Sequence, residues 1–259
     1  MNNAEVFQEL YLDADHSSLP AGARIGPVVV SANLMPEDPV TQKIAGDDME
    51  GQLRAVFQNM DRLLEQAGCN RQDVARVTLF MTQVSDRTAM NKVYQEWYPQ
   101  EESRPPHKYV PAQLPAGVQV TAQIIAFPGG RVRDIEIPGI HHNDWMSLGG
   151  LCGNILTSSR IFGTDPVTGK GSQDPDEHTA IIFRNADKLL DLGGGSWDNL
   201  TQATVFLQGE VLRETVLKQW RQRGSERADG PVLNFVETDL GGQGRGGLML
   251  PRLEIIALL

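Results

Sequence analysis

The sequence predicts an α+β protein made of two tandem copies of one unit of roughly 125 residues. Short motifs recur in the same order at nearly constant spacing, and each copy alternates β-branched runs with stretches of helical periodicity. The length of 259 residues also suits two ordinary domains. We place the boundary near residue 131, which gives a first domain of residues 1–131 and a second domain of residues 132–259.

The repeat is clearest in a turn motif, because Asp-Pro-Val-Thr occurs at residues 38–41 and again 127 residues later at 165–168. Three further segments recur in the same order after 126, 126 and 131 residues: 59–64 with 185–190, 78–80 with 204–206, and 123–126 with 254–257. The longer final spacing fits extra residues in the glycine-rich segment 241–247. Ordered recurrence at nearly one spacing indicates a duplication.

Each copy has the predicted order β-β-α-β-α-β, with helices marked by apolar residues at helical spacing and strands by β-branched runs. The first copy has strands at 28–31, 74–81 and 118–127 and helices at 49–67 and 87–97. The second has strands at 154–157, 200–207 and 248–258 and helices at 177–192 and 211–220. Further strands are expected near 108–110 and 233–236. Two helices per sheet predict a two-layer unit with both helices on one face and an apolar opposite face.

The composition is that of a soluble globular protein, with 40% hydrophobic and 22% charged residues. The net charge of -10, without a dense basic stripe, argues against a nucleic-acid partner. No apolar run approaches the roughly 20 residues of a membrane-spanning helix, and no secretory signal is visible. We therefore expect a cytoplasmic protein with no membrane partner. The two cysteines, Cys69 and Cys152, are too few for a disulfide framework or a cysteine-based metal site.

Both copies carry parts of one ordered set of motifs. The first copy has Ser31, Leu-Leu-Glu-Gln-Ala-Gly at 63–68, Asn-Lys-Val-Tyr at 91–94, Arg-Pro-Pro at 104–106 and Ile-Ile-Ala at 124–126. The second has Ser158, Asp-Pro-Val-Thr-Gly at 165–169 and Glu-Ile-Ile-Ala at 254–257. This ordered set resembles the YjgF/RidA family, and it covers most of the chain beyond the first 25 residues. No single motif is specific, but the set occurs twice.

The resemblance implies a chorismate-mutase-like fold whose units assemble as trimers. We expect a homo-oligomer, a trimer of two-domain chains that forms a pseudo-hexamer. The resemblance also implies hydrolysis of reactive enamines or imines, such as 2-aminoacrylate or 2-aminomuconate, to a keto acid and ammonia. In such members an arginine holds the substrate carboxylate and a glutamate positions water in a pocket between units. Neither a cofactor nor a metal is expected.

Each copy departs from the family pattern. The clamping arginine is replaced by His107 in the first copy and by Leu233 in the second, and the family glutamate is Gln123 in the first copy and Glu254 in the second. Because glutamine cannot take up a proton, we predict composite pockets in which Glu254 activates water. The candidates for holding carboxylates are Arg160, Arg245, Arg104 and His107.

A polar and aromatic segment, residues 140–145, precedes the first strand of the second copy. His142 is a candidate proton carrier because imidazole titrates near neutrality, and Trp145 is a candidate stacking partner for a conjugated substrate. Ser159 and Gln123 complete the predicted substrate-binding set. Each candidate also has a structural explanation, such as a solvent-facing strand position for Glu254.

We therefore expect a hydrolytic deaminase that acts on a small carboxylate substrate in its enamine or imine form. The main alternative is a non-catalytic metabolite-binding or assembly protein of the same fold. A weaker alternative is a chorismate-processing enzyme.

Overall fold

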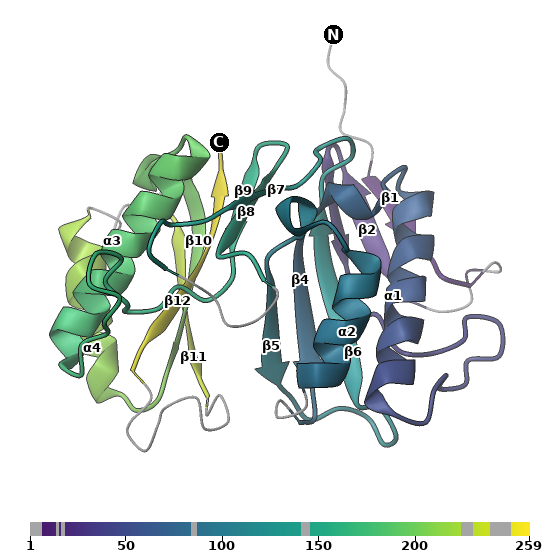
Figure 1. Ribbon diagram of the computed structural model, residues 1–259. Helices are drawn as coiled ribbons and strands as arrows, with labels where there is room; N and C mark the ends of the chain where they lie inside the picture. The colour runs from purple at the N-terminus through teal and green to yellow at the C-terminus, as the bar shows by residue number, and fades with distance from the viewer. Residues whose placement is uncertain are drawn as a thin grey trace, which may run out of the picture. The chain divides into compact units, whose positions relative to one another are not determined.

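The computed structural model describes residues 7–13, 16, 19–83, 87–140, 146–223, 230–238 and 250–259. The chain folds into two compact units, Met1–Arg133 and Asp134–Leu259, and each is built around its own six-stranded sheet (Figure 1). No helix within the described ranges has both the length and the apolar composition needed to cross a lipid bilayer.

The sheet of unit 1 has the strand order β1-β2-β3-β6-β4-β5. It is mixed, because β4 and β5 run parallel while β6 pairs antiparallel with β3 and β4. The strands are β1 (Phe7–Leu10), β2 (Gly22–Ile25), β3 (Val28–Ser31), β4 (Val74–Met81), β5 (His107–Pro111) and β6 (Val120–Ala126). The helices α1 (Met49–Gln66) and α2 (Arg87–Trp97) cover one face of this sheet (Figure 1).

The sheet of unit 2 repeats this arrangement in the order β11-β10-β12-β9-β8-β7, with β10 and β11 parallel and β12 antiparallel to β9 and β10. The strands are β7 (Arg133–Ile135), β8 (Gly149–Cys152), β9 (Ile155–Ser158), β10 (Leu200–Leu207), β11 (Val232–Glu237) and β12 (Arg252–Leu258). The helices α3 (Pro175–Gly193) and α4 (Val211–Gln222) lie on one face (Figure 1). The prediction of two tandem α+β units with mixed sheets is confirmed.

The short outer strands β1, β2, β7 and β8 were not predicted because, unlike the equally short β3 and β9, each contains at most one β-branched residue. Two of these strands begin with a glycine that the packing requires. A Cβ on Gly22 would lie 2.6 Å from the Val30 carbonyl oxygen, and a Cβ on Gly149 would lie 2.8 Å from a methyl group of Leu189. A side chain at Gly22 would therefore collide with the backbone of β3, and a side chain at Gly149 would displace Leu189 on α3.

The face of each sheet opposite its helices was predicted to be apolar, but in unit 1 it carries polar side chains beside apolar ones such as Val30 and Ile125. In unit 1 this face carries Arg76, Thr78 and Gln123, and side-chain alternation places Thr204 and Glu254 on the corresponding face of unit 2. We call these two surfaces the open faces. They hold polar groups because the neighbouring strand positions, such as Val205 and Ile255, already supply the apolar core on the helix side.

A buried asparagine explains one of the repeated motifs. The Asn59 side-chain amide on α1 donates hydrogen bonds to the carbonyl oxygens of Met35 (2.9 Å) and Glu37 (2.8 Å). Its counterpart Asn185 on α3 does the same for Phe162 and Thr164, both at 2.9 Å. Each amide therefore fixes the turn that follows the strand β3 or β9 to the first helix of its unit.

We expect Asn59→Ala to lower the free energy of unfolding by about 2 kcal/mol, because two buried carbonyl groups lose their donor. Urea denaturation monitored by circular dichroism would measure the change. The matched control is Glu65→Ala at an exposed position of the same helix, which should stay within about 0.5 kcal/mol of the parent. Equal effects of the two substitutions would contradict the role of Asn59.

Candidate functional site

The strongest candidate site lies on the open face of unit 2, around Glu254 on β12. Leu253 and Ile255 belong to the hydrophobic core, so alternation along the strand turns Glu254 to the opposite face. Its side chain is nevertheless only 2% exposed. Glu254 is therefore a buried carboxylate. The alternative interpretation, that it is only a solvent-facing strand residue, is wrong.

The backbone around Glu254 is fixed from both neighbouring strands. Thr204 on β10 is its cross-strand partner, and Gln202 Nε2 donates to the Thr204 hydroxyl oxygen at 3.4 Å. On the other side, the Ile255 N–H donates to Ser158 Oγ at 2.9 Å. Unit 1 repeats the latter bond, since the Ile124 N–H donates to Ser31 Oγ at 2.9 Å. The serine of the repeated strand motif thus holds the closing strand in both units.

Two arginines lie on the same open face as Glu254. The Arg160 guanidinium stacks on the Phe206 ring at 5.0 Å, and the Arg252 guanidinium stacks on the Phe162 ring at 4.8 Å. They are 8% and 9% exposed, and Arg252 is the cross-strand partner of Phe206. The face therefore combines one carboxylate with two guanidinium groups whose orientation is restricted by aromatic rings.

Arg252, Thr204 and Phe206 were not predicted as site residues. A signal was available for them, because residues two apart on a strand share a face and residues paired across strands are neighbours. Once Glu254 is taken as a site residue, Arg252 can be predicted to share its face, because the two residues are two positions apart on one strand. Thr204 and Phe206 follow only when the register between β10 and β12 is known.

The predicted substrate ligand Ser159 is buried, and its hydroxyl group donates to the carbonyl oxygen of Leu148 at 3.1 Å. This bond joins the segment after β9 to the residue before β8. The predicted site residues His142, Trp145 and Arg245 lie outside the described residues. Within the described part of the chain, no group of three or more His, Cys, Asp or Glu side chains is arranged to hold a metal ion.

Two predicted residues of unit 1 lie away from its open face. His107 is buried and stacks on Tyr94 of α2 with a centroid distance of 4.0 Å, and its Nε2 lies 3.0 Å from the Tyr109 hydroxyl. Arg104 donates hydrogen bonds to the carbonyl oxygens of Tyr98 (2.8 Å) and Pro99 (3.1 Å) and so stabilises the loop after α2. His107 thus lies on the helix side of the sheet, and Arg104 lies in the loop after α2. Gln123, in contrast, is exposed on the open face.

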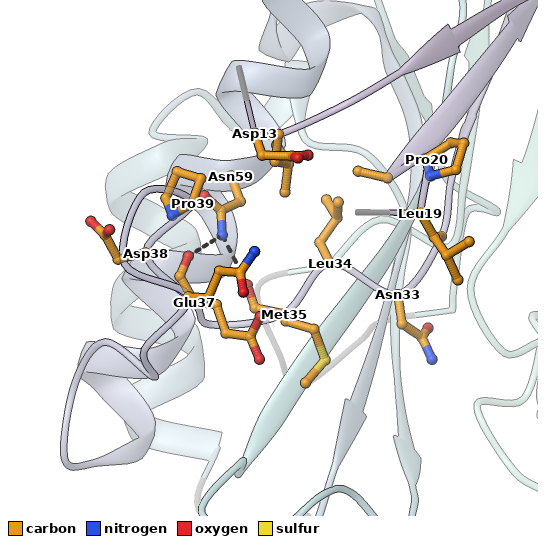
Figure 2. Close-up of a pocket in the computed structure, with 14 residues that line it drawn as sticks. Asp13, Leu19, Pro20, Asn33, Leu34, Met35, Glu37, Asp38, Pro39 and Asn59 are labelled. Carbon is orange, nitrogen blue, oxygen red and sulfur yellow. Dashed lines mark hydrogen bonds between the residues drawn. The ribbon is translucent and has the colours of Figure 1, made fainter. Parts of the chain in front are cut away.

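A cavity of about 400 Å³ lies beside α1 in unit 1 (Figure 2). The described residues that line it include the carboxylates Asp13, Glu37 and Asp38 but no lysine or arginine, which disfavours an anionic ligand. Asn59 at its wall already binds the turn, as the dashed lines in Figure 2 show. Backbone and side-chain hydrogen bonds from Thr41 lower the pKa of Asp38, so this carboxylate stays charged. We therefore do not assign a carboxylate substrate to this cavity.

The model of the family described as Endoribonuclease L-PSP matches residues 16–127. A RutC family protein of Pyrococcus abyssi is 32% identical over 105 residues, which are 40% of this chain and 81% of that protein. The chain belongs to the YjgF/RidA family. The match accounts for unit 1, and the internal repeat extends the relationship to unit 2.

Other relatives of the family carry names that describe activities. A 2-iminobutanoate/2-iminopropanoate deaminase of Salmonella typhimurium is 26% identical over 107 residues, 40% of this chain and 83% of that enzyme. Among solved structures, Escherichia coli TdcF with bound serine is 20% identical, with a TM-score of 0.42 over 49% of this chain and 98% of TdcF.

His178 on α3 contacts the residue that precedes Arg252. Its Nε2 lies 3.2 Å from the Pro251 carbonyl oxygen, and its Nδ1 lies 3.2 Å from the Ser172 carbonyl oxygen. Burial lowers the pKa of His178 from the usual 6.5, although both carbonyl groups act in the other direction. The unfolded chain therefore binds this proton more readily than the folded chain does.

Consequently, the stability that depends on neutral His178 should be complete above about pH 6.5 and should be lost as the pH falls. Urea midpoints at pH 7.5 and pH 5.5 would measure the loss. The loss should be smaller in His178→Gln than in the parent, whereas His16→Gln, at an exposed position, should match the parent. An unchanged loss in His178→Gln would contradict this assignment.

Proposed function

We propose that this protein is a hydrolytic deaminase of small imine or enamine amino acids, and that the reaction takes place on the open face of unit 2. Membership of the YjgF/RidA family and the names of relatives such as the 2-iminobutanoate/2-iminopropanoate deaminase support this reaction class. The observation that carries the choice of site is Glu254, a carboxylate that is 2% exposed and shares its face with Arg160 and Arg252.

The reaction needs a group that positions and deprotonates water. Glu254 accepts a proton from water as the water oxygen bonds to the imine carbon, and it passes this proton to the imine nitrogen, which becomes an amine. The carbinolamine then loses ammonia as the carbon–nitrogen bond breaks and the carbonyl group of the keto acid forms. The balance is one imine and one water to one keto acid and one ammonia.

Unit 1 does not offer this chemistry at the matching position. Gln123 stands where unit 2 has Glu254, and a carboxamide cannot take up the proton of the attacking water. Gln123 is also exposed, whereas Glu254 is buried. A carboxylate in a site with little water interacts more strongly with a developing charge than one in bulk solvent. Both differences favour unit 2 as the reacting unit.

The two arginines suggest how a substrate is held. A guanidinium group binds a carboxylate through two parallel hydrogen bonds, and stacking on Phe206 or Phe162 restricts its orientation. One arginine suffices for a monocarboxylate such as 2-aminoacrylate. Two arginines on one face also fit a dicarboxylate such as 2-aminomuconate, and we propose this compound as a second substrate class.

Replacing the acid/base group should stop turnover. We expect Glu254→Gln to lower kcat for 2-iminobutanoate, generated in situ, by at least about 10²-fold, because the amide cannot accept the proton. Formation of 2-oxobutanoate and ammonia would be followed against the spontaneous rate. Glu237→Gln, the same change at an exposed position of β11, is the control and should retain the parent rate. Full turnover by Glu254→Gln would overturn the role of Glu254, and a parent rate no higher than the spontaneous rate would overturn the proposed function.

The arginines should separate the two substrate classes. Arg160→Gln and Arg252→Gln should each raise KM for 2-aminomuconate about tenfold to a hundredfold, because each removes charge-assisted hydrogen bonds. For a monocarboxylate such as 2-aminoacrylate, only one of these two substitutions should raise KM. Arg213→Gln is the control. Arg213 also stacks on a phenylalanine, Phe235, at 4.4 Å, but it belongs to α4 and not to the open face. If neither substitution changes KM for either substrate, the arginines do not bind carboxylates.

A further inference from the structure

The helix layer of unit 2 contains a histidine beside the start of the strand that carries Arg252 and Glu254. His178 belongs to α3, which packs against β12. Its ring atoms Nε2 and Nδ1 each lie 3.2 Å from a carbonyl oxygen, that of Pro251 for Nε2 and that of Ser172 for Nδ1. Pro251 precedes Arg252 in the chain, so the first contact holds the backbone next to the arginine.

The stack between Arg252 and Phe162 depends on two backbone segments. The guanidinium lies 4.8 Å from the centre of the ring. The adjacent residues Leu253 and Ile161 form an antiparallel bridge, in which the N–H of each donates to the carbonyl oxygen of the other at 3.2 and 2.7 Å. Antiparallel pairing places the next residues along, Arg252 and Phe162, opposite each other. The stack therefore requires that both segments keep their relative position.

His178 contacts both of these segments. It binds the backbone next to Arg252 through the carbonyl oxygen of Pro251. It also lies against the backbone next to Phe162, because a Cβ on Gly163 would be only 2.5 Å from atoms of the imidazole ring. One side chain of α3 therefore sets the spacing between the segment that carries the guanidinium and the segment that carries the aromatic ring.

Unit 1 has a glutamine in the equivalent place. Gln52 on α1 stands 126 residues before His178 and is 2% exposed. Its Nε2 donates to the carbonyl oxygen of Gly117 at 2.8 Å, and its Oε1 accepts the N–H of Gln119 at 2.7 Å. Gln119 immediately precedes β6, as Pro251 immediately precedes β12. In both units a polar side chain of the first helix thus holds the start of the closing strand.

The contact to Pro251 requires a hydrogen-bond donor, because a carbonyl oxygen only accepts. A neutral imidazole carries one N–H and can supply it from Nε2. The amide of a glutamine can supply a donor from nearly the same position, as Gln52 does in unit 1. A leucine fills a similar volume but has no donor. The contact can therefore be removed without changing any residue of the open face.

We propose that His178 is a positioning residue for the reaction of unit 2, which acts through the backbone to keep Arg252 stacked on Phe162 and oriented toward a substrate carboxylate. The histidine belongs to the helix side of the sheet and does not itself meet the substrate. A guanidinium that is oriented before binding loses less conformational freedom when it binds. Carboxylate binding by Arg252 rests on the proposed function, whereas the effect of His178 on the stack does not.

The first test is NMR of the isotope-labelled full chain. The Nε–H signal of Arg252, identified by its loss in Arg252→Gln, reports the stack through the ring current of Phe162, and Phe162→Leu gives its position without the ring. We expect His178→Leu to move the signal most of the way to that position, and His178→Gln to leave it near the parent position. Gln52→Leu removes the equivalent anchor of unit 1 and is the matched control, which should not move the signal.

The second test is the kinetics of 2-aminomuconate hydrolysis. His178→Leu should raise KM about threefold to tenfold and leave kcat unchanged, because it weakens carboxylate binding without touching the acid/base group. In the Arg252→Gln background the same substitution should raise KM no further, since the residue on which it acts is already gone. His178→Gln and Gln52→Leu should both keep the parent KM.

Two outcomes would overturn the proposal: an Arg252 signal that stays at the parent position in His178→Leu, or a rise in KM that is as large in the Arg252→Gln background as in the parent. If His178→Leu does not fold, His178→Asn takes its place with the same expectations, because its shorter amide reaches the position of Nδ1 but not that of Nε2. Failure of the proposed function is distinguishable, because it appears as a parent rate no higher than the spontaneous rate, whereas the Arg252 signal needs no turnover.

Discussion

The composition of the two open faces depends on one constraint, the alternation of side chains along the closing strand of each unit. On β12 it turns Leu253 and Ile255 into the core and leaves Glu254 on the open face, and on β6 it does the same for Gln123. A slip of one residue would exchange the two faces and bury the carboxylate among aliphatic side chains. The serine that accepts the N–H of the next residue, Ser158 in unit 2, helps to hold this register.

Burial of charged side chains on the open face of unit 2 is costly for folding. Moving an ionised side chain out of water costs several kcal/mol unless other groups compensate. The rings of Phe206 and Phe162 beneath Arg160 and Arg252 provide part of that compensation. A duplicated scaffold can carry this cost in one unit, because each unit has its own sheet, core and helix-to-turn hydrogen bonds.

The two units share the contacts that maintain their scaffold but differ in the residues of their open faces. The residues that maintain the scaffold are equivalent in both, as the pairs Asn59 with Asn185 and Ser31 with Ser158 show by making the same hydrogen bonds. The residues of the open faces differ in charge, because Glu254 corresponds to Gln123 in the sequence of unit 1.

The duplication, the fold class and the principal elements could be predicted from the sequence, since these depend on local periodicity and on recurring motifs such as the Asp-Pro-Val-Thr turn. The sequence also pointed to Glu254. The side chains that share a face with Glu254 became known from the folded structure, because cross-strand register brings Arg252 and Phe206 together and depends on pairing between distant segments. For the same reason the sequence could not show that His107 lies beneath α2, away from Gln123, or that Arg76 shares a face with Gln123.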